Sequence, residues 1–404
     1  MCDDRFVIAG RRQTRFARRN AGHDRCSRRF MPKKLAALCC LLVAATIGVA
    51  AQSTVAQLAA SGWQAIQKGD ADRAAALFGE ALTMRPNDAV LNLGAGVAAH
   101  LRGREENATR LLQKAVQLEP GLTPASQLLG EIAYHDGHLD LAIKTYEAAL
   151  DHAPGNPALT QRLEAWRNES AAYDSFETIK DDRFAVMFDG PVEQKLAARA
   201  VSVLGAAFWR IGKTIGAYPS APINVILYTA KQFRDVTGAP EWAGGGFDGQ
   251  IRMPIRGALQ NPAEFDRILT HELVHAMLHG VAPRNVPAWL NEGLAMYFEG
   301  DNAADAAAVE HALAAAHVFV PLSVLQAGFS RLNSAQASVA YAESLFAVTT
   351  LMDRIGPSGL TQLLQDLDSG ERLNEALQRF GFTLSDFEST LARRVGVAIP
   401  STRR

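Results

Sequence analysis

A repeat with a period of 34 residues restricts the fold of the N-terminal part of the chain more than any other feature. Between residues 55 and 156, six positions recur in register without a gap. They are Gly62, Gly96 and Gly130; Gly69, Gly103 and Gly137; Ala74, Ala108 and Ala142; Phe78, Leu112 and Tyr146; Ala81, Ala115 and Ala149; and Pro86, Pro120 and Pro154. Small residues let two helices approach closely, and a proline stops the second helix of each unit. The pattern therefore predicts three stacked helix pairs.

This pattern resembles the tetratricopeptide repeat, with three units over 55–156. Such units stack into a short curved solenoid, and the resemblance implies a protein partner or an extended peptide on its concave face. Residues 157–175 are expected to form a capping helix and linker. An irregular, alanine-rich helical bundle is the alternative, but six positions in register argue against it.

Beyond the repeat the sequence has a different pattern. RFAVMFDG (183–190) alternates like a strand, and INVILY (223–228) is typical of a buried strand. GGGFDGQIRMP (244–254) predicts a turn and then an edge strand that ends at a proline. After Pro262 nearly all of the sequence has helical spacing. Residues 176–400 are therefore predicted to form an α+β domain, and the chain as a whole should be mainly helical.

The stretch HELVHAMLHG (271–280) contains the most specific chemistry. In a helix, His271 and His275 project from one face one turn apart, so that two imidazoles can share one zinc ion. Glu272 points roughly 100° away and can reach a water molecule without binding the metal itself. Two ligands do not make a catalytic site, and HExxH alone also occurs by chance.

A third ligand is available in PAWLNEGLAMYFEG (287–300). Glu292 lies on what is predicted to be the next helix, after a loop that turns the chain back. Two histidines, one glutamate and an open position are typical of a catalytic zinc site rather than a structural one. Thiolate ligands are not available there, because all four cysteines precede the repeat: Cys2, Cys26, Cys39 and Cys40.

Other candidate ligands are weaker. His279 lies about 12 Å along the helix axis from His271, too far to share one ion with it, and is interpreted as a satisfied or solvent-facing histidine. The metzincin pattern is excluded by Leu278 and Val281, which stand where it needs glycine and histidine. Glu299 could orient a ligand histidine or lie at a solvated helix end, and the sequence leaves both open.

HELVH followed by WLNEGLAMYFE resembles the gluzincin metallopeptidases, most closely the peptidase MA-like domains that follow tetratricopeptide repeats in exported bacterial proteins. The resemblance covers about 176–355. It implies a zincin-like fold, one Zn²⁺ per chain and Glu272 as the catalytic acid/base. The implied zinc ligands are His271, His275 and Glu292.

Two further expectations concern the substrate. The glycine-rich stretch has Asp248 where the aminopeptidase branch captures a free α-amine, which favours endopeptidase action. Segment 244–254 could hold the substrate backbone by strand addition. Tyr341, in VAYAESLFAV, is the candidate donor to the oxyanion, with a phenol packed in the core as the alternative.

The charge of the chain is unevenly distributed. Residues 1–51 carry nine Arg and two Lys against three Asp, whereas the remainder has 30 Lys and Arg against 39 Asp and Glu. The acidic body has no clustered basic stripe in its sequence, so nucleic acid is not an expected partner.

The basic N-terminal stretch is predicted to address the protein for export. MPKKLAALCCLLVAATIGVAAQS has two lysines, an apolar run over 35–50 and small residues before a cleavage site after Ala51. Met31 is then the true start, and the mature chain begins at Gln52. We expect a periplasmic or secreted protein. The alternative is an uncleaved anchor, the one case in which a membrane is a partner.

These features together predict an exported zinc metallopeptidase of the endopeptidase type, acting on a peptide or protein substrate. The repeats would recruit that substrate or a protein partner. The alternative from another class is a non-catalytic repeat scaffold that carries a degenerate peptidase-like binding domain.

Overall fold

The structure is a computed structural model. It describes residues 54–237, 244–255, 257–282, 286–300, 302–329 and 332–397. The predicted signal peptide and the four cysteines lie outside these residues. Val55–Arg404 form one compact unit. Within the described ranges, no helix combines the length and apolar character needed to cross a membrane.

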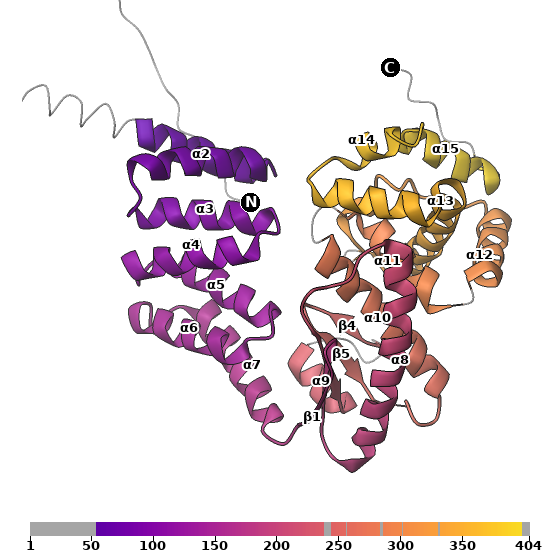
Figure 1. Ribbon diagram of the computed structural model, residues 1–404, viewed down its shortest axis with the longest axis horizontal. Coiled ribbons are helices and arrows are strands. Elements are labelled where there is room, and N and C mark those ends of the chain that lie inside the picture. The colour runs from indigo at the N-terminus through magenta and orange to yellow at the C-terminus, as the bar shows by residue number, and fades with distance from the viewer. Residues whose placement is uncertain are drawn as a thin grey trace, which may run out of the picture. The chain divides into compact units, whose positions relative to one another are not determined.

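The N-terminal region is a helical repeat, as the period predicts (Figure 1, indigo to magenta). Residues 54–67 are helical, and the next helices are α2 (Ala71–Met84), α3 (Ala89–Leu101), α4 (Glu105–Leu118), α5 (Thr123–His135), α6 (Leu139–His152) and α7 (Pro157–Tyr173). Helices α2, α4 and α6 begin 34 residues apart, and so do α3, α5 and α7. The regular start points show that the repeat in sequence is a repeat in structure.

The recurring glycines have two different structural roles. One set lets the two helices of a unit touch: an added Cβ would lie 2.8 Å from Phe78 at Gly62, 2.8 Å from Leu112 at Gly96 and 2.4 Å from Tyr146 at Gly130. We expected the other set to mark a helix contact as well, and this prediction is wrong. These glycines adopt positive φ in the turn within each unit. Its members are Gly69 (74°), Gly103 (62°) and Gly137 (78°).

A mixed five-stranded sheet follows the repeat. Its strands are β1 (Glu177–Lys180), β2 (Phe184–Phe188), β3 (Ile223–Tyr228), β4 (Gly246–Phe247) and β5 (Ile251–Pro254), in the order β1-β2-β3-β5-β4. Strands β2, β3 and β5 are parallel, and β1 and β4 pair antiparallel at the two edges. The predicted edge strand ending at Pro254 is therefore wrong: β5 lies between β3 and β4. The glycine-rich stretch folds back as a hairpin, so its first arm takes the edge.

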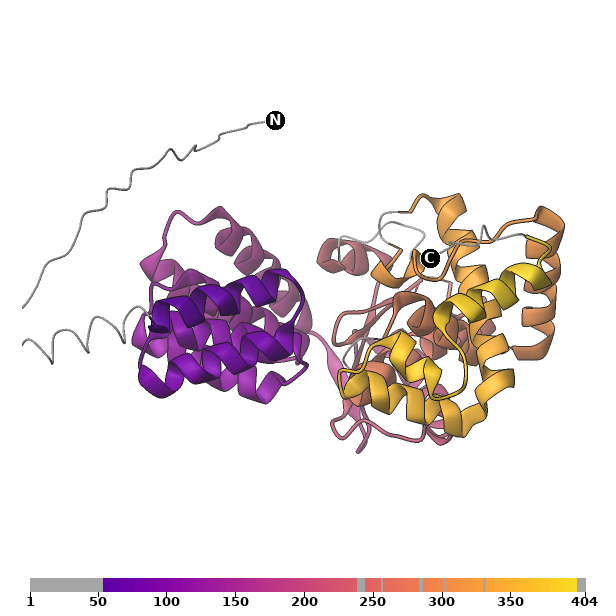
Figure 2. The same cartoon turned by 90° about the horizontal axis from the view of Figure 1, so that it is seen from above.

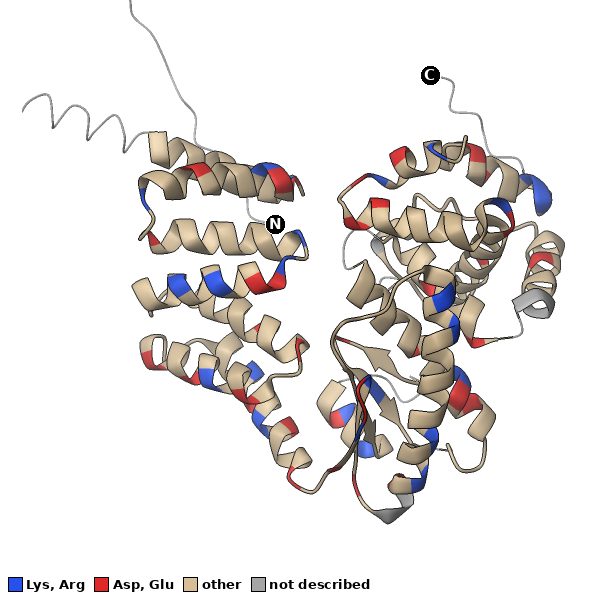
Figure 3. Ribbon diagram, in the orientation of Figure 1, with Lys and Arg blue, Asp and Glu red and all other residues tan. Residues whose placement is uncertain are grey.

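The remaining elements are mainly helical. They are α8 (Pro191–Ile215), α9 (Ala230–Thr237), α10 (Pro262–Val281), α11 (Ala288–Glu299), α12 (Asn302–Ala316), a 3₁₀ turn (Leu325–Ala327), α13 (Ser334–Asp368), α14 (Leu373–Gln378) and α15 (Leu384–Arg394). Helices α8, α10, α11 and α13 pack beside one another (Figures 1 and 2). Over the described elements, Lys and Arg are interspersed with Asp and Glu (Figure 3).

One face of the sheet packs against α8 and α10. Phe184, Val225 and Ile251 of the strands are fully buried. Leu204 of α8 and Leu269 of α10 belong to the same core. Burial of each such side chain stabilises the fold by about 1.5–3 kcal/mol relative to exposure. This packing fixes α10, and with it the direction in which its histidines point.

The opposite face of the sheet is covered by α9 and the C-terminal end of α7. Ile226 and Tyr228 of β3 are buried against Phe233 of α9, and Tyr173 and Phe176 pack on them. Helix α7, expected to be a capping helix and linker, therefore also contributes to the core of the region that follows it.

Candidate metal centre

Helix α10 presents both histidines of HELVH to one pocket. Asn261 caps its N-terminus by accepting the Glu264 N–H, and Pro262 occupies the first helical position. The apolar side of α10 is buried in the core, which leaves His271 and His275 half-buried on the side facing α11.

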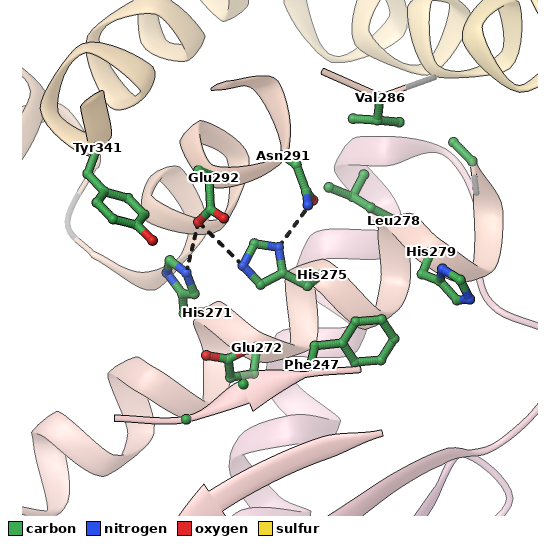
Figure 4. A pocket seen from close by; sticks show the side chains of 13 residues that line it. Phe247, His271, Glu272, His275, Leu278, His279, Val286, Asn291, Glu292 and Tyr341 are labelled. Carbon is green, nitrogen blue, oxygen red and sulfur yellow. Dashed lines mark hydrogen bonds and ion pairs between the residues drawn. The ribbon is translucent and has the colours of Figure 1, made fainter. Parts of the chain in front are cut away.

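Glu292 of α11 completes a group of three ligand atoms (Figure 4). Its Oε2 lies 3.5 Å from His271 Nε2 and 3.6 Å from His275 Nε2. All three atoms lie within 4.8 Å of one another. Ligands around one tetrahedral zinc ion are separated by about 3.3 Å, given bonds of about 2.0–2.1 Å. The sequence-predicted residues are thus brought together at the spacing of one ion.

The outer nitrogens of both imidazoles have their own partners. His271 Nδ1 lies 2.6 Å from Glu299 Oε2, and His275 Nδ1 lies 3.1 Å from Asn291 Oδ1. Glu299 is held in turn by the guanidinium of Arg267. Such contacts fix the ring orientation and aim Nε2 at a metal. For Glu299, the structure favours the orienting role over a solvated helix end.

Asn291 and Arg267 are missing from the sequence-based site. Asn291 directly precedes Glu292, and Arg267 lies one helical turn before His271. Their nearness to candidate ligands in the sequence was the one signal that could have pointed to them. Neither position has a distinctive spacing, because their roles depend on where α10 and α11 cross.

The donor set fits zinc. Glu292 Oε2 is buried and has no hydrogen-bond partner in the described part of the chain, an expensive arrangement unless a cation is bound there. Burial lowers the pKa of His271, but the carboxylates of Glu292 and Glu299 beside its two ring nitrogens outweigh burial and raise the pKa to about 10. The site therefore favours positive charge between its carboxylates. Two imidazoles and one carboxylate are a known ligand set for catalytic zinc.

Glu272 lies in the same pocket but outside the ligand group. Only 7% of the residue is exposed. Burial raises its pKa to about 7; His271 opposes this shift, and the charges of Glu292 and Glu299 add to it. A carboxyl group with a pKa near neutrality can both accept and return a proton.

The pocket around these residues has a volume of about 450 Å³ and is lined by β4, α10, α11 and α13. Tyr341 of α13 lies on its wall, and burial together with the nearby Glu292 and Glu272 raises the pKa of the phenol to about 12. His279 also lines the pocket, with its ring 5.5 Å from that of Phe247, and is not in the ligand group. The structure thus brings Tyr341 to the centre and keeps His279 away from the ligand atoms.

A second pocket of about 370 Å³ opens beside the first. Both are lined by Gly245, His271, Glu272 and Tyr341. Open space therefore extends to two sides of the candidate centre.

Comparison with known proteins gives a family for this part of the chain. The family model of the Peptidase MA superfamily matches residues 204–395, a range that contains every candidate site residue. The match begins later and ends later than the resemblance inferred from the sequence, so α14 and α15 are part of it. Residues 204–395 are thus similar to the Peptidase MA superfamily. No curated protein matches the chain.

Solved structures similar to this chain include two tetratricopeptide repeat (TPR) domains and a chaperone. The first TPR domain of human RPAP3 is 23% identical, with 30% of this chain and 94% of that chain covered and a TM-score of 0.28. The chaperone SycD of Yersinia enterocolitica is 17% identical, with 30% and 88% covered and a TM-score of 0.29. The Sgt2 TPR domain from Aspergillus fumigatus is 19% identical, with 35% and 93% covered and a TM-score of 0.29.

Proposed function

We propose that the chain is a zinc-dependent metallopeptidase that cleaves within peptide chains. One observation carries the proposal: His271, His275 and Glu292 point three ligand atoms at one place, with Glu272 beside them, inside a Peptidase MA superfamily domain. Zinc, when bound, supplies a Lewis acid that acidifies water and polarises the substrate carbonyl.

The protein's own groups would handle protons and charge. Glu272 takes a proton from the attacking water and returns it to the leaving amine, a role that suits a carboxyl group with a pKa of about 7. Tyr341 donates a hydrogen bond to the carbonyl oxygen as negative charge develops there. Asn291 and Glu299 hold the two imidazoles in place.

Endopeptidase action is supported by the shape and the charges of the site. The two pockets leave room for substrate on both sides of Glu272. Asp248 binds the guanidinium of Arg252 and is not among the residues that line either pocket, so it offers no carboxylate to a free α-amine.

The repeats suggest how substrate is selected. We propose that the concave face of the helical repeat binds a peptide segment of the substrate or of a protein partner, since stacked helix pairs present an extended concave surface. Nucleic acid is not proposed as a partner.

Export completes the proposal. It rests on the lysines, the apolar run and the small residues before Gln52 in the sequence. Sequencing the N-terminus of exported protein should find Gln52 first. Material that still carries residues 1–30 would contradict the proposal.

Zinc analysis combined with a peptide-library assay tests the function. We expect one zinc ion per chain, cleavage of internal peptide bonds, loss of cleavage with a chelator and recovery on adding zinc. A chain that binds zinc at this site but cleaves no library peptide would favour the alternative, a repeat scaffold with a degenerate peptidase-like domain.

A further inference from the structure

Arg252 is a buried cation on the face of the sheet away from α8 and α10. It belongs to β5, and only 1% of the residue is exposed. Its Nη1 donates to Glu169 Oε1 at 2.6 Å and to the Tyr228 hydroxyl at 2.6 Å, and its Nη2 donates to the Tyr134 hydroxyl at 2.7 Å. The guanidinium thus joins β5 to β3, α5 and α7.

Both carboxylate oxygens of the acidic partner, Glu169, also have hydrogen-bond partners. It lies on α7 and is 2% exposed. Its Oε2 accepts the Tyr134 hydroxyl at 2.8 Å, and its Oε1 also accepts the hydroxyl of Tyr173. The pair is therefore a complete hydrogen-bonded network rather than an isolated contact. Such pairs add little net stability over apolar packing, so stability alone does not account for it.

The third side of the guanidinium faces the active-site strand. Arg252 Nε donates to both carboxylate oxygens of Asp248, each at 3.0 Å. Asp248 directly follows β4, and the β4 residue opposite Arg252 is Gly246. The network therefore binds the β4–β5 hairpin on the face of the sheet away from α8 and α10.

Gly245, the residue directly before β4, lies against Glu272. A Cβ added at Gly245 would come within 3.2 Å of Glu272 Cγ and 3.3 Å of its Oε1. Gly245, Gly246 and Phe247 line the pocket that contains the candidate metal ligands. A small shift of β4 would change both the surface offered to a peptide backbone and the packing on Glu272.

We propose that Arg252 is a positioning residue: through Asp248 it fixes the edge strand β4 beside Glu272, and through Glu169 it makes that position depend on helix α7 at the end of the repeat. The inference rests on the proposed function, because β4 is the strand expected to pair with the substrate backbone. It gives the repeat region a physical route to the site that does not require contact with the metal ligands.

Asp248→Asn tests the link to β4. The variant keeps the size of the side chain and leaves Arg252 its buried partner Glu169, so the fold should persist. Loss of a charge-assisted hydrogen bond should speed amide exchange over residues 244–250 by about tenfold and raise KM for a peptide by a similar factor. Zinc content and kcat should change much less.

Asp181→Asn is the matched control. Like Asp248, Asp181 lies in a turn between two strands and pairs with a nearby arginine, Arg183. Its turn joins β1 and β2, and β1 is the edge strand opposite β4. Its variant should leave exchange over 244–250 and KM unchanged. Unchanged exchange and KM in Asp248→Asn, or faster exchange that includes the β1–β2 hairpin equally, would overturn the proposal.

Glu169→Gln tests the link to α7. The amide can still accept from Arg252 but carries no charge. We expect the same selective rise in exchange over 244–250 as in Asp248→Asn, although the altered residue lies on another element. If exchange rises in α7 alone, the proposed coupling is wrong. Exchange is measurable even if the protein cleaves no peptide, so failure of the proposed function and failure of this inference give different results.

Discussion

At the scale of single residues, the pocket places two glutamates in different environments. Glu292 directs at two imidazole nitrogens a buried oxygen that has no hydrogen-bond partner among the described residues. Glu272 lies beside this group and has its pKa raised to about 7, mainly by burial. The first environment suits a metal ligand and the second suits a proton acceptor. Position on α10 or α11, rather than residue type, sets the role.

Tyr341→Phe tests the oxyanion donor. Removing one such donor should lower kcat by about 10- to 1000-fold, with zinc content and folding little changed. Tyr218→Phe, at an exposed tyrosine, is the control and should retain full activity. Unchanged turnover in Tyr341→Phe would assign its phenol to packing, where its ring already contacts Phe329 at 5.1 Å.

Glu343→Gln tests a pH dependence of stability. Glu343 is 1% exposed, and burial raises its pKa to about 7, partly opposed by the Val320 N–H that it accepts. The folded protein therefore keeps this proton to higher pH than the unfolded chain, and stability is lost as pH rises from about 4.5 to about 7. Glu343→Gln should be more stable than the wild type by about 1–2 kcal/mol at pH 8 and similar to it at pH 4.5.

Urea denaturation at both pH values measures this difference. A stability difference that is the same at pH 8 and pH 4.5 would show that titration of Glu343 is not its cause.

The candidate ligand residues could be predicted from the sequence, and Glu299 was left open as an orienting residue, but Asn291 and Arg267 were not predicted. His271 and His275 are linked by helical periodicity, which is a local property. Asn291 and Arg267 act through a crossing of two helices, which is not encoded in any short spacing. Tyr341 was named because the oxyanion needs a donor besides zinc, and not from any local spacing.

At the scale of elements, the approach of α11 to α13 sets the geometry of the pocket. Gly293 is next to the candidate ligand Glu292, and a Cβ there would lie 2.3 Å from the Ser344 carbonyl oxygen. Only glycine lets the two helices come this close. The contact brings Tyr341, one turn before Ser344 on α13, to the wall of the pocket.

Gly293→Ala should therefore reduce the free energy of unfolding by about 3 kcal/mol or prevent folding, because backbone cannot move aside as a flexible side chain can. Gly79→Ala is the control: this glycine lies in α2 with nothing within 4 Å of an added Cβ. It should gain up to about 1 kcal/mol from helix propensity. Equal effects in the two variants would contradict a tight α11–α13 contact.

Strongly periodic elements could be predicted, whereas short ones could not. The repeat helices and INVILY follow from their patterns. Strand β1 and helix α9 were not predicted, because each is short and β1 is mostly exposed. The edge position was misassigned because a hairpin with a two-residue arm, β4, leaves no alternating pattern.

At the scale of the whole molecule, α7 belongs both to the helical repeat and to the region that contains the sheet. It continues the register of the repeat, and its residues Glu169 and Tyr173 complete the buried network around Arg252. This double role of α7 could not be predicted from the sequence, because Arg252 lies in a strand and its partners are far away in the chain. The two regions can be separated only if the cut keeps the ion pair between Glu169 and Arg252.

Two shortened chains test this point. A chain that begins at Asn156 loses Tyr134 but keeps α7 and the ion pair between Glu169 and Arg252. It should fold, bind zinc and cleave short peptides. A chain that begins at Asp174 lacks Glu169 and should be insoluble or melt at clearly lower temperature, since losing one partner of a buried ion pair costs about 3–5 kcal/mol. Equal melting temperatures would show that α7 contributes nothing to the second region.

The central claim is that one zinc ion and Glu272 together hydrolyse peptides, and Glu272→Gln and Glu292→Gln test it most directly. Bound zinc and peptide hydrolysis are measured on the same samples. Glu292→Gln should lose zinc and activity together, because it removes an anionic ligand. Glu272→Gln should keep one zinc ion per chain while hydrolysis falls by about 10²–10⁴-fold. Loss of zinc in Glu272→Gln would contradict the ligand set, and full activity with zinc bound would contradict the mechanism.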